Sequence, residues 1–156
     1  MSLKIPLAYR LFFLWWEPII TATSMIGLAF LNPLSWLTMI HPASAPATDA
    51  DIPLGTRIIV MQAGTMMLFW AYVVGVVLRA TDDIKIWKLV VGASLVGDFL
   101  HLASFIPFGW EVYTAFGTWG QSEWGNIFLT YVGATFRTAF LLGIGLSGSN
   151  AKNKLG

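Results

Sequence analysis

Four long apolar runs, separated by shorter polar segments, dominate the pattern of hydrophobic and polar positions. They are Leu11–Leu31, Ile58–Leu78, Ile86–Phe108 and Gly125–Leu146. A helix of about 20 apolar residues crosses the hydrocarbon core of a bilayer. The pattern therefore predicts an all-α integral membrane protein, in which one four-span bundle occupies the whole chain, 1–156. The first run is too long for the apolar core of a signal peptide and no A-x-A-like site follows it, so we expect it to remain as a span.

The segment between the first two runs, Asn32–Arg57, has a different character. It contains four prolines together with serine, threonine and alanine. Prolines interrupt regular structure, so this segment is predicted to form an extended cap or lid, with a short interfacial turn at Leu34–Ile40. His41 in this segment is expected to be solvated, without a function.

Composition narrows the class of protein. The chain is 56% hydrophobic and 11% charged, against about 25% charged in soluble domains. The net charge of +1 is spread without a basic stripe, which makes nucleic acid an unlikely partner. Cysteine is absent, so disulfides, thiolate nucleophiles and zinc–thiolate sites are excluded. We expect the lipid bilayer and a lipophilic small molecule as partners, and a homodimer remains open.

Basic residues predict the orientation in the membrane. Cytoplasmic loops of membrane proteins are enriched in Lys and Arg, and one side of the predicted spans carries nearly all of them. That side has Lys4, Arg10, Arg79, Lys85, Lys88, Lys152 and Lys154, whereas Arg57 stands alone on the other. Both termini are therefore predicted to be cytoplasmic, and the endoplasmic reticulum is the expected membrane for a eukaryotic chain. The aromatic loop 109–124, with Glu111 and Glu123, is predicted to lie at the outer interface.

Among the polar residues inside the predicted spans, five stand out, with at least one in each span. Polar groups at bilayer depth are costly and normally face the bundle interior, where they pair with one another. At 1.5 Å per helical residue, they lie from about 9 to about 24 Å from the cytoplasmic edge. We therefore predict one polar column. In order of depth, it contains Glu17, Arg137, Asp98, His101 and Gln62.

The column contains the groups needed for acid–base chemistry. Arg137 lies in depth between two carboxylates and can pair with either, and two carboxyls in different surroundings can serve as acid and base. The competing interpretation is a structural ion pair that fixes helix packing. A metal site made by Glu17, Asp98 and His101 is disfavoured because an arginine lies beside it. We therefore expect neither a metal nor another cofactor.

Other features predict how the column is surrounded. Pro18 is expected to kink the first span or free a carbonyl toward the column. Ala93 and Gly97 are expected to permit close helix packing. Methionine and aromatic side chains can line an adaptable apolar pocket around the column. These side chains are Met25, Met61, Met66, Met67, Phe69, Trp70 and Phe99.

Three short segments carry a resemblance to a known family: Trp15-Trp16-Glu17-Pro18, Gly97-Asp98-x-x-His101 and Phe136-Arg137-Thr138. With its size and four spans, the chain resembles small fungal integral-membrane proteins of polyketide and terpenoid biosynthesis, a group that includes the aurovertin-pathway epoxide hydrolase. The resemblance implies an epoxide hydrolase or cyclase. Soluble limonene-type epoxide hydrolases use an Asp–Arg–Asp arrangement, and the same group types are present here.

The resemblance implies the following roles. Asp98 is the general base, oriented by Arg137 or His101, and Glu17 is the general acid, although the two carboxyls can exchange roles. The expected substrate-binding residues are Gln62, Tyr72, Tyr131, Trp16 and Phe99. Two alternatives stay open: a sterol or terpene isomerase or cyclase that uses the same carboxylates, and a non-enzymatic lipid-binding or proton-coupled transport subunit.

Overall fold

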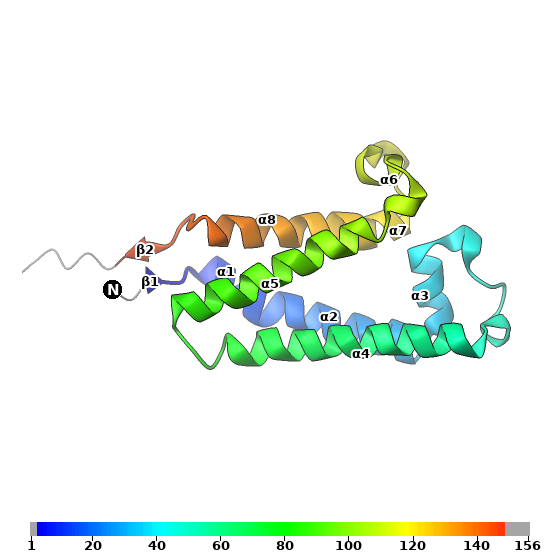
Figure 1. The fold of residues 1–156 in the computed structure, drawn as a ribbon, viewed down its shortest axis with the longest axis horizontal. Helices are drawn as coiled ribbons and strands as arrows, with labels where there is room; N and C mark the ends of the chain where they lie inside the picture. The colour runs from blue at the N-terminus through cyan, green and yellow to red at the C-terminus, as the bar shows by residue number, and fades with distance from the viewer. Residues whose placement is uncertain (1–2, 149–156) are drawn as a thin grey trace, which may run out of the picture.

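The computed structural model describes residues 3–148 as four long helical segments, with short helices at one end (Figure 1). The first long segment is continuous from α1 through two π-helical stretches, and the fourth begins as a short α-helix followed by a π-helical stretch. The long segments are α1 (Leu7–Leu11), η1 (Phe12–Trp16), α2 (Glu17–Met25) and η2 (Ile26–Phe30); α4 (Leu54–Val77); α5 (Ile84–Ala103); and α7 (Gln121–Glu123), η7 (Trp124–Phe128) and α8 (Leu129–Leu141).

The remaining elements connect the long helices or join the chain ends. They are α3 (Pro33–Ile40), η3 (Pro42–Ser44), η4 (Asp49–Asp51), η5 (Ile106–Phe108), α6 (Glu111–Thr114), η6 (Phe116–Thr118), and the strands β1 (Leu3–Lys4) and β2 (Ser147–Gly148). The two strands pair antiparallel, and the Tyr9 hydroxyl donates to the Ile144 carbonyl at 2.9 Å. The described chain ends therefore lie together at one end of the bundle (Figure 1).

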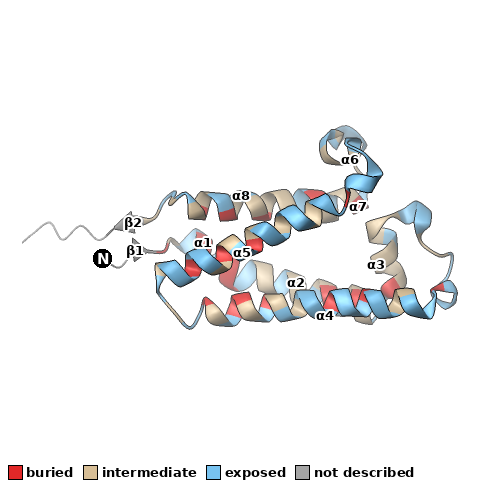
Figure 2. Cartoon of the chain, in the orientation of Figure 1, coloured by how far each residue is buried: buried red, intermediate tan, exposed pale blue. Residues whose placement is uncertain are grey.

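Within residues 3–148, three helices are long and apolar enough to cross a membrane: Leu7–Phe30, Leu54–Val77 and Ile84–Phe108. Large hydrophobic side chains cover much of the outer surface; Leu89, for example, is 74% exposed, and Figure 2 shows exposed positions along every long helix. Such a surface is unusual for a soluble monomer and suits contact with lipid. The structure thus supports an all-helical membrane protein.

The fourth predicted span, Gly125–Leu146, differs most from the structure. The long helix starts earlier, at Gln121, where the Glu123 carboxylate accepts a hydrogen bond from the Gly120 amide at 2.8 Å. It ends at Leu141, before Gly143 and Gly145, whose φ angles of 79° and 75° are left-handed. Glycine adopts such angles readily and ends helices. This helix contains Asn126 and Arg137, and it is not among the helices of the described chain that are long and apolar enough to cross a membrane.

The boundaries of the other three long helices differ by a few residues from those that the sequence predicts. The first and second helices begin at Leu7 and Leu54, each directly after a proline, a residue favoured at helix starts. The third begins at Ile84, where the Asp83 carboxylate caps the Lys85 amide at 2.8 Å. The basic residues Lys152 and Lys154, used to predict the orientation, lie outside the described residues.

The long helices form two pairs, α2 with α4 and α5 with α8. In Figure 1 the pairs lie close together at the chain ends and diverge toward α3 and α6. Their shared core lies at the end near the termini, where Trp87 is 1% exposed, packs against Phe13 and Phe140 and donates from Nε1 to the Thr81 carbonyl at 2.9 Å.

Small residues do allow close helix packing, but at different positions from those predicted. A Cβ atom at Gly97 would meet nothing within 4 Å, whereas one at Gly64 would lie 2.5 Å from Cβ of Ala29. A Cβ at Gly75 would lie 3.6 Å from Pro18. The close approach is therefore between α4 and the first long helix, and the prediction for Gly97 was wrong.

The proline-rich segment contains a regular helix, α3, where the sequence predicted a short turn. The side-chain oxygen Oδ1 of Asn32 caps this helix by accepting a hydrogen bond from the Ser35 amide at 3.1 Å. At its other end the Ser122 hydroxyl donates to the Ile40 carbonyl at 3.0 Å, and Asn126 donates to the Met39 carbonyl at 3.0 Å. Helix α3 therefore connects the first helix pair to the start of the fourth long helix through these hydrogen bonds.

We expect Gly64→Ala to destabilise the protein, because the added methyl group must push α4 away from Ala29; overpacking of this kind costs about 1–3 kcal/mol. Gly92→Ala is the matched control, since a Cβ at Gly92 meets nothing within 4 Å and alanine is the better helix former. Thermal unfolding in detergent should show a lower midpoint for Gly64→Ala and an equal or higher one for Gly92→Ala. Equal midpoints for both variants would contradict the packing described here.

Candidate functional site: a buried ion triad

Arg137 lies between two carboxylates contributed by different helices. Its Nη1 donates to Oδ2 of Asp98 on α5 at 2.7 Å, and its Nη2 donates to Oε1 of Glu17 on α2. Only 7% of the Arg137 side chain is exposed, against 17% for Glu17 and 14% for Asp98. The predicted pairing of Arg137 is confirmed, and it involves both carboxylates at once.

Local sequence makes room for this guanidinium. Gly133 precedes Arg137 by four residues and so lies one helical turn away on the same face. A Cβ atom at Gly133 would collide with Nη1 of Arg137. The arginine therefore folds back over a glycine, which places its two donor nitrogens between α2 and α5.

Glu17 begins α2, directly after the π-helical η1 and directly before Pro18. Proline has no N–H, so the Leu14 carbonyl, four residues earlier, lacks its usual helical donor. Nη2 of Arg79 donates to this carbonyl, and Nη1 of Arg79 donates to the Gly75 carbonyl at 2.7 Å. Pro18 does free a carbonyl, but the carbonyl binds Arg79 and not the polar column.

Two polar atoms of the triad have no hydrogen-bond partner in the described residues. They are Oε2 of Glu17 and Nε of Arg137, and both atoms are buried. A buried donor or acceptor without a partner costs about 1–3 kcal/mol. The triad therefore retains one acceptor and one donor with which a small polar group can bond.

His101 does not join the triad. Its side chain is half-buried, and its ring packs against Phe105 with centroids 5.4 Å apart, near the backbone of Asn126. Among the hydrogen bonds of residues 3–148, none links His101 to Glu17, Asp98 or Arg137. The predicted role of His101 in orienting Asp98 is not supported, and Arg137 alone holds that carboxylate.

Gln62 also lies away from the triad, so the predicted column is shorter than expected. Gln62 is exposed. On α4 it lies about 20 Å from Gly75, the residue of α4 that faces Pro18. Depth along the membrane normal does not determine which way a side chain points, and the rotation of α4 turns Gln62 outward. The prediction that Gln62 contacts the column was wrong.

The other predicted substrate-binding residues are distributed around the bundle. Tyr72 and Phe99 are 67% and 59% exposed, on the outer surface, and Trp16 is 41% exposed and stacks on Phe12. Tyr131 is half-buried and donates from its hydroxyl to the Tyr113 carbonyl at 3.2 Å. The expected apolar pocket is not formed among the described residues either: Met25 is buried and Trp70 packs against the core, whereas the other proposed members lie on the outer surface. Those that are exposed are Met61, Met66, Met67, Phe69 and Phe99.

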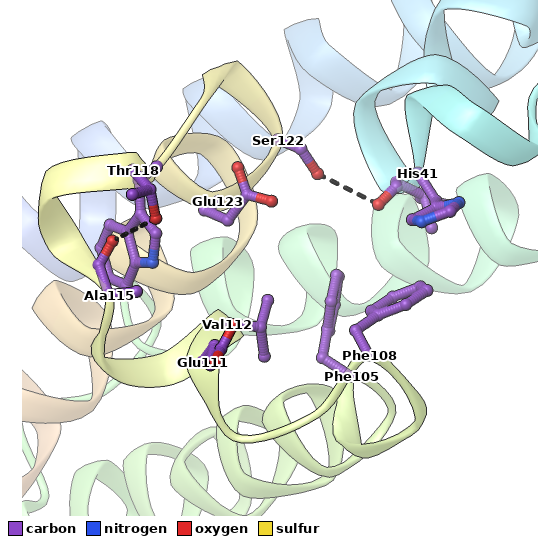
Figure 3. A pocket seen from close by; sticks show the side chains of 11 residues that line it. His41, Phe105, Phe108, Glu111, Val112, Ala115, Thr118, Ser122 and Glu123 are labelled. Atoms are coloured by element: carbon purple, nitrogen blue, oxygen red, sulfur yellow. Dashed lines mark hydrogen bonds between the residues drawn. The ribbon is translucent and has the colours of Figure 1, made fainter.

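Two hollows lie outside the triad. One, of about 240 Å³, is open to the surface and lies between the ends of α3 and α5 and the loop that contains α6 (Figure 3). His41, which the sequence predicts to be solvated and without a function, lines this hollow and is partly exposed. The other, of about 350 Å³, is an apolar groove between α2 and α4 that contains Pro18, Tyr72 and Arg79. The sequence did not predict this groove, although Pro18 and Tyr72, which line it, were among the residues singled out. The contact of Arg79 with the Leu14 carbonyl was not predicted either.

Comparison with known proteins identifies a family whose function is unknown. No curated protein matches the chain, and no solved structure matches it. A family model described as a domain of unknown function, DUF7704, matches residues 2–147. This match covers the four long helices and all three residues of the triad. The chain therefore belongs to the DUF7704 family.

Proposed function

We propose that this chain is a membrane-embedded enzyme that opens epoxides of a lipophilic polyketide or terpenoid by acid–base catalysis, with hydrolysis or cyclisation. The observation that carries the proposal is the bridging arginine. Arg137 holds Glu17 and Asp98 together in a buried site, and one oxygen of Glu17 is left without a partner. The resemblance to fungal biosynthetic membrane proteins supplies the substrate class.

The charge of the triad supports an acid and a base in the same site. Two ionised carboxylates and one guanidinium carry a net charge of −1, and an uncompensated charge at membrane depth is costly. One proton shared by the two carboxyls balances the site. The protonated carboxyl then serves as the general acid and the ionised one as the general base.

Ring opening follows from these two groups. The acid gives its proton to the epoxide oxygen as the bond between this oxygen and one ring carbon breaks. The base takes a proton from water, or from a hydroxyl of the substrate, as the new carbon–oxygen bond forms at the same carbon. A diol or a cyclic ether results, and exchange of one proton between the carboxyls restores the site. We assign Glu17 as acid because its Oε2 is free of partners, and Asp98 as base.

The surroundings of the triad suit a substrate that arrives from the bilayer. Its residues belong to α2, α5 and α8, whose other faces carry exposed apolar side chains. We further propose four spans, the fourth being the helix that carries Arg137, with both termini cytoplasmic and the endoplasmic reticulum as the membrane. The basic residues Arg10, Lys85 and Lys88 all lie toward the end near the termini.

We expect Glu17→Gln and Asp98→Asn to reduce epoxide opening by about 100-fold or more, since each removes one member of the acid–base pair. Asp82→Asn, at a side chain that is 92% exposed, should retain full activity. The measurement is turnover of a lipophilic polyene epoxide in oxygen-18 water by purified protein in detergent, with products analysed by mass spectrometry. Labelled diol indicates attack by water, and unlabelled cyclic ether indicates attack by a substrate hydroxyl.

We expect both variants to fold, because the amide oxygens of Gln and Asn can still accept hydrogen bonds from Arg137. Thermal unfolding shows whether each variant is folded. Full turnover by folded Glu17→Gln and Asp98→Asn would refute the catalytic assignment and leave the triad as a structural link between helices. Wild-type turnover of a sterol or terpene alkene, with solvent deuterium incorporated and no water added, would instead support an isomerase. A lipid-binding or transport subunit would turn over neither substrate.

The proposed topology can be tested with single cysteines, because the chain has none. Ala50→Cys and Ala80→Cys place the same substitution at exposed positions in loops at opposite ends of α4. In sealed microsomes, a membrane-impermeant maleimide should label Ala80→Cys directly and Ala50→Cys only after detergent is added. Ala151→Cys, beyond the described residues, should behave like Ala80→Cys if the fourth helix spans. Labelling of Ala50→Cys in intact microsomes would invert the proposed orientation.

A further inference from the structure

The cavity at the end opposite the termini has chemistry of its own, separate from the triad. It measures about 240 Å³ and is formed where the end of α3, the end of α5 and the loop around α6 and α7 meet. Figure 3 shows side chains from these segments around one opening, with carboxylates and aromatic rings both present. Neither Glu17, Asp98 nor Arg137 lines it.

Aromatic rings form much of its wall. Phe105 is 4% exposed and packs against Phe108 with centroids 5.5 Å apart. Phe108 in turn stacks on the His41 ring at 4.8 Å, with the ring planes 4° from parallel. Trp119 completes the aromatic lining. The stacked pair fixes two segments that are far apart in sequence, so the wall is held by tertiary contacts.

The charged groups of the cavity are both acidic. Glu111 and Glu123 line it, and no lysine or arginine does. Neither carboxylate is in an ion pair within residues 3–148. One oxygen of Glu123 accepts a hydrogen bond from the Gly120 amide. Arg57, a cation at this end of the bundle, is held by Asp49 at 2.9 Å. The cavity therefore has negative charge without a compensating cation in the described chain.

Trp119 adds one unused donor. Its Nε1 is buried and has no hydrogen-bond partner among the described residues. Buried indole N–H groups usually find an acceptor. An oxygen atom brought by a ligand would supply that acceptor.

We infer that this cavity binds an organic ammonium ion that carries a nearby oxygen, the chemistry shared by choline and by zwitterionic lipid headgroups. Carboxylates neutralise the cation, and the faces of aromatic rings attract weakly hydrated ammonium groups. A metal ion fits less well, because no group of three or more His, Cys, Asp or Glu side chains in the described residues is placed to hold one. The inference is independent of the proposed enzymatic activity.

Calorimetric titration of the full-length protein with choline tests this inference. The protein is kept in a maltoside detergent, which has no ammonium group. We expect binding with a dissociation constant of about 1 mM or lower. The uncharged isostere 3,3-dimethyl-1-butanol, which has carbon in place of nitrogen, should bind at least about tenfold more weakly. Equal binding of both compounds, or no binding of choline, would overturn the inference.

Variants locate the site. Glu111→Gln removes one carboxylate and should weaken choline binding about five- to tenfold, whereas Asp82→Asn, an equivalent loss of charge at the other end of the bundle, should not. Trp119→Phe keeps an aromatic face but removes the N–H, so it should weaken choline more than tetramethylammonium, which has no oxygen. Unchanged choline affinity in folded Glu111→Gln would assign the binding elsewhere and refute the proposed site.

Binding measurements in nanodiscs of different lipids distinguish a lipid headgroup from a free amino alcohol as the ligand. If lipid headgroups occupy the cavity, choline should bind more weakly in phosphatidylcholine discs than in discs of an uncharged galactolipid, because the phosphatidylcholine headgroup competes while neither surface carries a net charge that would attract choline. Equal affinity in the two kinds of disc would identify a free amino alcohol as the ligand of the same site.

Discussion

The bridge from Arg137 to Glu17 and Asp98 is the interaction on which the arrangement of this protein depends. The two helix pairs, α2 with α4 and α5 with α8, diverge away from the termini (Figure 1). Arg137 and Asp98 belong to one pair and Glu17 to the other, so the guanidinium crosses between them. Removing one partner of a buried ion pair typically costs about 3–5 kcal/mol, since the remaining charge is left uncompensated.

The same bridge combines a structural contribution with the groups that the proposed chemistry needs. A structural ion pair requires one carboxylate per arginine, whereas this site has two, and Oε2 of Glu17 has no partner in the part of the chain that the structure describes. The excess acidic group supports catalysis, and the position between helix pairs supports a structural contribution. Both follow from placing a delocalised guanidinium, with five donors, where lipid offers no competing hydrogen bonds.

The polar residues show how far sequence reasoning reaches. Charge at membrane depth is so unfavourable that Glu17, Asp98 and Arg137 had to meet, and they do. Gln62 and His101 fulfilled the same depth criterion but lie outside the triad, because rotation about a helix axis, and not depth alone, decides which side chains converge. An uncharged amide is less costly to leave outside a cluster than a charge, so its rotation was less constrained.

The sequence by itself determined the helical class, the membrane-compatible surface and the charged residues that pair, because each follows from the cost of exposing polar groups to hydrocarbon. Only the tertiary structure decided which glycines permit close packing, that Arg79 takes the carbonyl released by Pro18, and that His41 stacks on Phe108 beside two carboxylates. These contacts join residues far apart along the chain. Their formation depends on how helices rotate and pack, which hydrophobic periodicity alone does not specify.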